Sequence, residues 1–321
     1  MSSRIHPSVS SFAGNEPTVL PTGPVLVASD ASADADAAFP LAQVVAAPGR
    51  VDVRVITVVQ PFAMPLYGVE AMAVPLETNQ AADSAREIAI RDQMARLLPE
   101  DAHWPVTVLD GDPVREIVEY ARRCDARVLV VGRGRHGAIE RVLGGESVLR
   151  MLQQEDTPVF AAERGMTTLP KRVVMATDFS VFSLYASQVG MSMVAPDALV
   201  YLVNVRPPYV AVDPILRSQA VGYREQATQG FAELHERLER DAVQFQDVLI
   251  DGNASDALLA FAKSVDADLI VLATHGYGFL RRAVLGSVAA ELVRRGSCSL
   301  LIVPGSARTL AAARAHSVPA S

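Results

Sequence analysis

The chain lacks the features that define several large classes of protein. It has only two cysteines, Cys124 and Cys298, which is too few for a disulfide framework or a zinc cluster and favours a reducing compartment. No apolar run approaches the roughly 20 residues that a bilayer-spanning helix requires, and the N-terminus has no charged stretch followed by an apolar one. We therefore expect a soluble, cytoplasmic protein with no membrane partner.

Long basic runs and familiar catalytic signatures are also missing. The formal net charge is -7 and the basic residues occur in scattered pairs, which disfavours nucleic acid as a partner. The sequence has no nucleophile elbow, no His-x-x-x-His metal spacing and no Gly-Lys-Ser/Thr ending of a P-loop. We therefore assign no catalytic residue and no metal ligand.

An internal repeat is the main feature that is present. The segment Leu109–Ala121 aligns without gaps with Ile250–Ala262, a shift of 141 positions, and an apolar run ending in aspartate opens each half, at Asp30 and Asp178. Such a constant register predicts a tandem duplication. We expect a flexible segment over 1–20, domains over 21–164 and 171–305, a linker over 165–170 and a C-terminal tail over 306–321.

Apolar runs of strand length alternate with helical periodicity in both halves, which predicts βαβ units and parallel sheets buried on both faces. The expected fold is α/β, with two tandem, doubly wound, Rossmann-like domains of five strands each, related by a pseudo-two-fold axis. Asp112 and either Asn253 or Ser255 are expected as helix caps. The expected strands are 25–29, 53–58, 106–109, 128–131, 159–161, 173–177, 199–205, 245–249, 269–273 and 300–303. The expected helices are 35–45, 83–98, 113–123, 146–153, 183–194, 217–241, 255–264 and 287–295.

The stretch from Ala273 to Val288 predicts a strand end, a glycine-bearing loop and a helix that begins near Ser287. Gly276 and Gly286 allow backbone N–H groups to approach an anion closely, and the start of the helix adds its positive dipole end. This stretch therefore predicts a phosphate-binding site.

The spacing from Ala273 through Gly276 and nine further residues to Gly286 and Ser287, with the opening aspartate and the five-stranded order, resembles the nucleotide-binding universal stress protein family. The family pattern is Gly-x-x-Gly, nine residues, then Gly-Ser or Gly-Thr. The chain departs from it at Ala273, where the family has glycine. Alanine does not readily adopt positive φ, so the departure costs little only if this position has ordinary strand-end dihedrals.

The resemblance implies an adenine nucleotide, ATP with or without Mg²⁺, as the ligand of the second half. Carried over position by position, it assigns Asp178 and Val205 to the adenine and ribose end. The other residues that it assigns to the site line the crossing loop or contact the phosphates: Leu272, Ala273, Gly276, Gly286, Ser287 and Val288.

Simpler roles stay open for some residues near this predicted site. Asp178 also suits a turn that serves Ser180 and the following helix. His275 is either a phosphate contact or an exposed loop residue. Arg281 and Arg282 either neutralise phosphate charge or lie on a solvated face.

The first half differs at the equivalent positions, which are Gly132, Arg135, Gly145 and Glu146. Glu146 would repel a phosphate in a site of reduced dielectric, and Arg135 is a candidate to pair with it. We therefore expect an emptied or repurposed site in the first half, with Asp30 as a remnant.

The segment Gly132–Gly137 also satisfies Gly-x-Gly-x-x-Gly after a predicted strand. The dinucleotide fingerprint belongs to the first βα turn of its domain, whereas only one helix and one strand of the half follow this segment. We therefore do not predict an NAD site.

The expected function is binding of an adenine nucleotide in a stress-response or regulatory role, with at most slow ATP hydrolysis. Two alternatives stay open: a nucleotide-free interaction module with both sites degenerate, and an enzyme related to the adenine-nucleotide α-hydrolase superfamily. The resemblance also implies that the last strands, Val159–Ala161 and Leu300–Val303, pair the two halves as an intramolecular pseudo-dimer or pair two chains as a homodimer.

Overall fold

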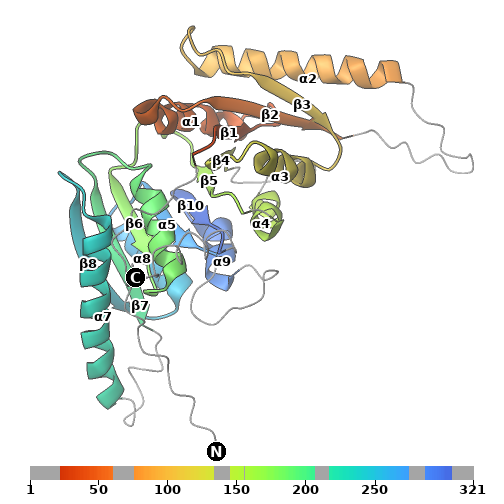
Figure 1. Cartoon of the computed structure of the whole chain (residues 1–321). Coiled ribbons are helices and arrows are strands. Elements are labelled where there is room, and N and C mark those ends of the chain that lie inside the picture. The colour runs from red at the N-terminus through yellow and green to blue at the C-terminus, as the bar shows by residue number, and fades with distance from the viewer. Residues whose placement is uncertain are drawn as a thin grey trace, which may run out of the picture. The chain divides into compact units, whose positions relative to one another are not determined.

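The computed structural model describes residues 22–60, 76–133, 145–154, 156–206, 217–274 and 286–305 of the chain. These residues form two compact units, one that ends at Leu169 and one that begins at Pro170 (Figure 1). Each unit is an α/β domain with five parallel strands, so the predicted fold class is confirmed.

The first unit has the strand order β3-β2-β1-β4-β5, with every neighbouring pair parallel. Helices α1 and α2 pack together, as do α3 and α4, so the sheet is doubly wound. The strands are β1 (Val25–Ala28), β2 (Val53–Val59), β3 (Val106–Asp110), β4 (Val128–Gly132) and β5 (Val159–Ala162). The helices are the 3₁₀ turns η1 (Ala35–Ala37) and η2 (Ala47–Gly49), and α1 (Ala38–Ala46), α2 (Leu76–Leu97), α3 (Pro113–Arg123) and α4 (Gly145–Gln154).

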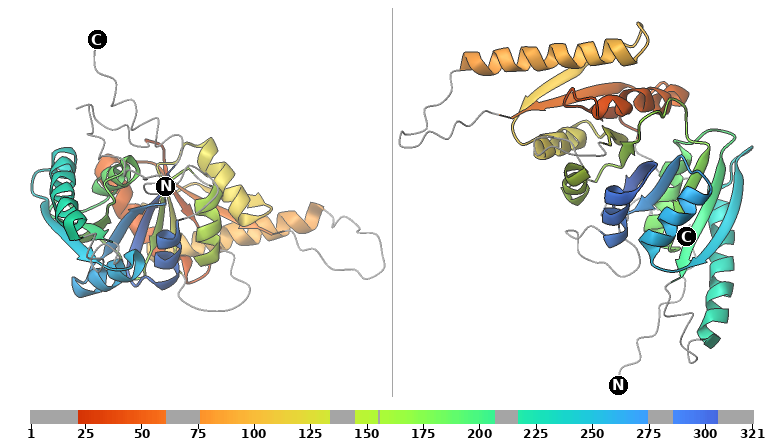
Figure 2. Two further views of the ribbon diagram at one scale, coloured as in Figure 1. Left: turned by 90° about the horizontal axis from the view of Figure 1, so that it is seen from below. Right: turned by 180° about the vertical axis from the view of Figure 1, so that it is seen from behind.

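The second unit repeats this plan with the order β10-β9-β6-β7-β8, again parallel throughout. Helix α5 packs against α7, and α8 packs against α9 (Figure 2). The strands are β6 (Arg172–Ala176), β7 (Leu199–Arg206), β8 (Gln244–Asp251), β9 (Leu269–Ala273) and β10 (Ser299–Val303). The helices are α5 (Val181–Met191), α7 (Arg217–Leu238), α8 (Ala254–Ser264) and α9 (Ser287–Arg295).

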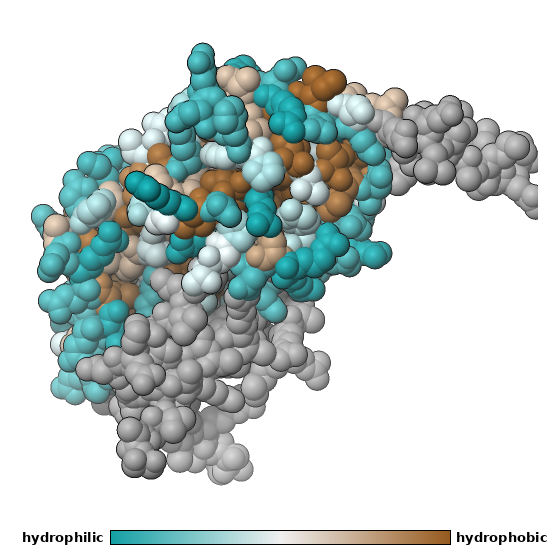
Figure 3. Space-filling model, turned by 45° about the horizontal axis from the view of Figure 1, so that its top comes forward, coloured by the Kyte–Doolittle hydropathy of each residue, from teal (hydrophilic) through white to brown (hydrophobic). Residues whose placement is uncertain are grey.

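The core of each unit is its central strands. Every residue of the central strands β1 and β4 is buried, because helices cover both faces of a parallel sheet and leave no polar face on these strands. Every residue of β10 is also buried, although this strand ends the order of the second unit. The edge strands β3 and β8 keep partly exposed side chains. Where the surface can be followed in Figure 3, hydrophilic side chains alternate with smaller groups of hydrophobic ones. Among the described residues, Ile88 of α2 is the large hydrophobic side chain with strong exposure, at 60%.

Several helix boundaries differ from the sequence expectation, and two helix starts show why. Helix α2 begins at Leu76, not at residue 83, since its first two turns are polar and carry no apolar periodicity. Helix α5 begins at Val181, not at residue 183, since Ser180 is its N-cap and accepts a hydrogen bond from the Ser183 N–H at 3.2 Å. Periodicity therefore marks the packed part of a helix better than its ends.

The strand order places one crevice in each unit. In such sheets a ligand binds at the carboxyl ends of the strands, where the connections turn in opposite directions. This point lies between β1 and β4 in the first unit and between β6 and β9 in the second. The residues that follow these four strands are therefore the ones that decide what each unit binds.

The helix caps provide a direct test of the fold. Asn253, and not Ser255, is the N-cap of α8, because its Oδ1 accepts from the N–H groups of Ser255 and Asp256. We expect Asn253→Ala to lower the free energy of unfolding by about 1 kcal/mol, measured by urea denaturation. Lys263→Ala at the exposed end of the same helix is the control and is expected to change it by a few tenths of a kcal/mol. Equal losses in the two variants would contradict the capping role.

Candidate functional site

The second unit brings the predicted site residues to one edge of its sheet. Asp178 follows β6, Val205 is the penultimate residue of β7, and Ala273 ends β9. Ser287 begins α9, which starts beside this edge because the Gly286 N–H donates to the Thr274 carbonyl at 3.1 Å. Gly276, His275, Arg281 and Arg282 lie outside the described residues.

Asp178 forms the tight turn that links β6 to α5. Its Oδ1 accepts from the Ser180 N–H at 3.1 Å, and Phe179 between them has a φ of 58°. The Thr177 hydroxyl supports the same turn by accepting from the Phe179 N–H at 3.0 Å. The structure therefore shows the turn role of Asp178, and its assignment to a ligand stays a prediction.

Ala273 has ordinary strand geometry. It is the last residue of β9 and pairs with Val303 of β10, so its backbone is extended and needs no positive φ. The side chain is half-buried. Alanine in place of glycine therefore imposes no backbone strain here, which was the condition on which the phosphate-loop hypothesis depended.

Gly286 is required by a close approach of two backbones. A Cβ at this position would lie 2.5 Å from the Thr274 carbonyl oxygen. Thr274 is itself fixed, because its N–H donates to the Val303 carbonyl and its hydroxyl accepts from the Gly305 N–H, both at 2.9 Å. Gly286 thus docks the start of α9 against the end of β9.

The N-terminus of α9 has neither a capping side chain on its N-cap residue nor an acidic residue in its first turn. Gly286 is the N-cap and has no side chain to satisfy the first N–H groups of the helix. Ser287 is exposed, Val288 is half-buried, and no acidic residue lies in the first turn of α9. The positive end of the helix dipole therefore faces the crevice without a charged partner on its own turn.

Two polar residues beneath the site were not predicted from the sequence. Asn204 of β7 is 3% exposed, and its Nδ2 donates to the Thr177 carbonyl at 2.8 Å. Its Oδ1 accepts from the Tyr223 hydroxyl of α7, also at 2.8 Å. The signal for Asn204 was an amide within an otherwise apolar strand, next to Val205.

The next residue of β7 is also held. Arg206 donates to both carboxylate oxygens of Asp251 at the end of β8, at 2.5 and 2.7 Å. The hydrogen bond from Arg206 lowers the pKa of Asp251 below its ordinary value. Both neighbours of Val205 in β7, Asn204 and Arg206, are therefore held by side-chain hydrogen bonds.

Backbone fills the corresponding space in the first unit. A Cβ on Gly132, at the end of β4, would lie 2.1 Å from the carbonyl oxygen of Asp34 and 2.5 Å from the Cα of Ala35. Gly132 is therefore a glycine because η1 packs directly on it, and not because a phosphate approaches it. This is a physical reason for the different residues at 132 and 273.

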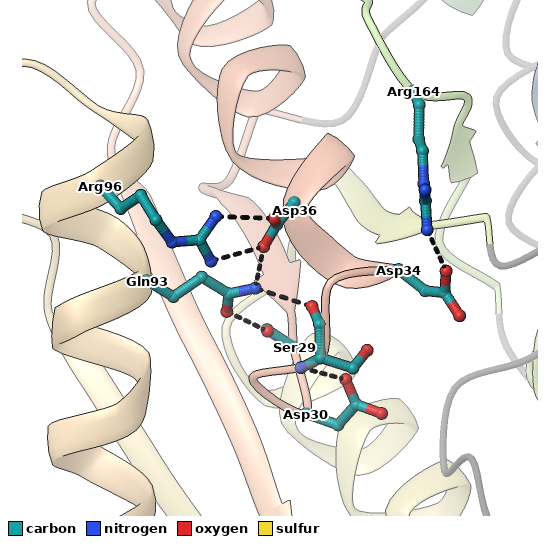
Figure 4. Close-up of polar contacts among 8 residues, drawn as sticks. Ser29, Asp30, Asp34, Asp36, Gln93, Arg96 and Arg164 are labelled. Carbon is teal, nitrogen blue, oxygen red and sulfur yellow. Dashed lines mark hydrogen bonds and ion pairs between the residues drawn. The ribbon is translucent and has the colours of Figure 1, made fainter.

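A polar network joins the turn after β1 and η1 to α2 (Figure 4). Gln93 of α2 accepts from the Ser29 hydroxyl at 2.7 Å and donates to the Ser32 carbonyl and to Asp36. Arg96 makes two hydrogen bonds to Asp36, at 2.8 and 3.1 Å. The polar groups at the start of η1 and α1 are thus satisfied by α2.

Both remaining acidic residues of the opening turn are also engaged. Asp30 forms a turn like that of Asp178, with its Oδ1 accepting from the Ser32 N–H at 3.0 Å, and its carbonyl accepts from Arg86. Asp34 pairs with Arg164 at 2.6 Å. These contacts give the Asp30 turn a structural role within the first unit, and the repurposing of the first site stays a prediction.

Glu146 lies in the first turn of α4 and is exposed. It therefore puts a negative charge at the helix end that corresponds to the one with Ser287 in the second unit. Its predicted partner Arg135 lies outside the described residues.

The described residues contain no group of three or more His, Cys, Asp or Glu side chains arranged to hold a metal ion. Within the same part of the chain, no helix combines the length and apolar character needed to cross a bilayer.

The repeated fold, with its crevice at the ends of β6 and β9, agrees with the family match. The sequence model of the universal stress protein family matches residues 22–162 and again residues 170–304. The chain belongs to the universal stress protein family. The resemblance inferred from the second-half loop is thus confirmed, and the match is a tandem one.

Individual relatives are distant. A universal stress protein of Methanocaldococcus jannaschii is 29% identical over 149 residues, which cover 44% of this chain and 85% of the relative. One of Mycobacterium bovis is 27% identical over 203 residues, 59% of this chain and 68% of the relative. A solved universal stress protein of Archaeoglobus fulgidus has a TM-score of 0.61 and 17% identity, over 89% of this chain and 99% of that one. At this identity the structural likeness shows the fold.

The packing of η1 on β4 predicts losses of stability of different size at two equivalent positions. We expect Gly132→Ala to lower the free energy of unfolding by about 3 kcal/mol, because the new methyl group must displace backbone. The matched change Ala273→Gly removes a methyl group and is expected to cost at most about 1 kcal/mol. Chemical denaturation measures both. A Gly132→Ala protein as stable as the wild type would refute the close packing.

The Asp36 network predicts a dependence of stability on pH. Burial raises the pKa of Asp36, but hydrogen bonds from Arg96 and Gln93 outweigh it, so the folded pKa lies below the ordinary value. The carboxylate therefore stabilises the fold above about pH 4 and loses this effect as the pH falls through the folded pKa.

We expect Asp36→Asn to cost at most about 1 kcal/mol at pH 7, because Arg96 is largely exposed. The difference from wild type should shrink as the pH falls below about 4, in urea titrations over a range of acidic pH values. A difference that stays constant over this range would show that the charge of Asp36 is not its cause.

Proposed function

We propose that this universal stress protein binds an adenine nucleotide, ATP with or without Mg²⁺, in its second unit and acts in a stress-response or regulatory role. The observation that supports this most is the uncapped N-terminus of α9, docked by Gly286 beside the end of β9 at the switch point of the sheet. Backbone N–H groups and a helix dipole at such a point suit a phosphate chain.

The residues divide between the two ends of the ligand. The Ser287 hydroxyl and the N–H groups of Ser287 and Val288 bind the phosphates, and Gly276 completes the loop. Asp178 and Val205 hold the adenine and ribose end. Leu272 and Ala273 line the floor between the two ends.

In the first unit the corresponding space is closed by η1, and the helix end carries Glu146. We infer one nucleotide site per chain. Bound nucleotide then biases a conformation or a partner contact, and hydrolysis is at most slow. The low cysteine content supports a cytoplasmic setting. Pairing of the two halves, and a homodimer, stay predictions.

The main alternative is an interaction module that binds no nucleotide. Mass spectrometry of small molecules released from the purified protein separates the two, together with thermal shifts in ATP, ADP and AMP, each with and without Mg²⁺. Absence of released nucleotide together with absence of any shift would favour the module. The hydrolase alternative requires turnover well above background that disappears in Ser287→Ala.

The two helix ends provide a sharp test of the site. We expect Ser287→Glu, which copies Glu146 of the first unit, to weaken ATP binding at least about tenfold, because a carboxylate then meets the phosphates. Stability without ligand should be unchanged or slightly higher, since a carboxylate suits the first turn of a helix. Isothermal titration calorimetry measures the affinity, and thermal melting measures the stability.

Glu146→Ser is the matched control and should leave ATP binding as in the wild type. Gly286 is a poorer test, because any side chain there collides with the Thr274 carbonyl and disturbs the loop itself. Unchanged ATP affinity in Ser287→Glu would place the phosphates elsewhere.

A further inference from the structure

The β6–β7 ladder stops just below the proposed site. Its last pair joins Ala176 to Val203, and the Thr177 N–H still donates to the Val203 carbonyl at 2.9 Å. In a continuing parallel ladder the Thr177 carbonyl would next accept from the Val205 N–H. The acceptor is instead taken by the side-chain amide of Asn204, at 2.8 Å.

Because the Asn204 side chain takes this hydrogen bond, the peptide groups of Val205 have no partner in the β6–β7 ladder. Residues of one parity along a strand point their N–H and C=O groups to the same side, so Val205 points them toward β6, as Val203 does. Because β6 ends at Ala176 and Asn204 satisfies the Thr177 carbonyl, the ladder provides no partner for Val205 on that side. Val205 is half-buried, so part of this residue is accessible, whereas Asn204 before it is buried.

Three contacts hold the peptide groups of Val205 in this position. Asn204 is bonded to the Thr177 carbonyl, the Tyr223 hydroxyl locks the other end of the same amide at 2.8 Å, and Arg206 is clamped to Asp251. A buried amide with both ends satisfied has one orientation, because the reversed orientation would place its oxygen against the Thr177 carbonyl oxygen, an acceptor against an acceptor.

The first unit lacks this device. Strand registers that pair Val25 with Val53 and Val173 with Val200 make Thr57 the counterpart of Asn204. The Thr57 hydroxyl is buried and has no hydrogen-bond partner among the described residues. Its neighbour Val58 is 5% exposed, so the peptide that corresponds to Val205 is covered.

We propose that Asn204, locked by Tyr223, is the positioning residue that sets base selectivity in the second unit, by turning the Val205 N–H and C=O into a fixed donor and acceptor for the base. An adjacent N–H and C=O match the ring acceptor N1 and the exocyclic amino donor of adenine. Hypoxanthine and guanine present the reverse order, a ring N–H beside a carbonyl. The inference rests on the proposed nucleotide site and specifies its base.

The test compares ATP with inosine triphosphate, which differs at this edge of the base, by calorimetry on the full chain with Mg²⁺. Asn204→Thr places the first unit's residue in the second. We expect its dissociation constant for ATP to rise about tenfold and that for inosine triphosphate by less than about twofold, so the preference for ATP nearly disappears. Thr57→Asn in the first unit is the control and should change neither value.

Tyr223→Phe provides a second, milder variant if Asn204→Thr folds poorly. It leaves the Asn204 amide without its lock, and we expect about a threefold loss for ATP with the same fall in preference. Equal losses for both nucleotides would show a merely structural role and overturn the inference, as would unchanged selectivity. A wild-type protein that binds neither nucleotide would overturn the proposed function as well, so the two failures are distinguishable.

Discussion

The difference between the two units depends on what packs against the carboxyl end of one strand at the switch point. This strand is β4 in the first unit and β9 in the second. In the first unit the Asp34 carbonyl lies 2.1 Å from where a Cβ on Gly132 would stand, so the chain's own backbone occupies that space. In the second unit Ala273 carries this methyl group, and the same approach is impossible. What bounds the crevice there is Thr274 and the start of α9, joined through Gly286. A single methyl group therefore excludes from the second unit the backbone packing that fills this space in the first.

In each unit, a side chain from the long helix after the second strand hydrogen-bonds to polar groups near the strand ends. The groups that it contacts differ between the two units. In the first unit Gln93 of α2 ties Ser29 to Asp36 and closes the opening turn on itself. In the second, Tyr223 of α7 orients Asn204, which takes over a ladder bond at the crevice. Both arrangements leave buried polar groups paired, so neither carries a large energetic penalty. The arrangements differ in which backbone groups remain available to a ligand.

The fold was largely predictable because burial on both faces leaves a plain signal. Strands such as Val128–Gly132 are continuous apolar runs, and Asp112 caps its helix as its position before Pro113 indicated. The start of α2 was missed because polar turns carry no periodicity. The reason for Gly132 and the role of Asn204 were out of reach for another cause. Each depends on a contact between segments distant in sequence, with η1 in one case and α7 in the other, and spacing along the chain does not encode such contacts.

Under the proposed function, the two helix ends explain how one copy of a duplicated fold can lose a ligand without losing stability. The first N–H groups of any helix and its dipole favour a negative charge nearby, whatever its source. In the first unit Glu146 supplies that charge covalently at the start of α4. At the start of α9 the first turn contains no acidic residue, so under the proposed function the phosphates of the nucleotide take that place. A carboxylate in the first turn stabilises the helix end without a ligand and also repels a phosphate. One substitution would therefore make the ligand unnecessary for stability and exclude it. After such a change nothing in the crevice needs to be kept for binding, and the backbone of η1 can close over the strand as it does at Gly132.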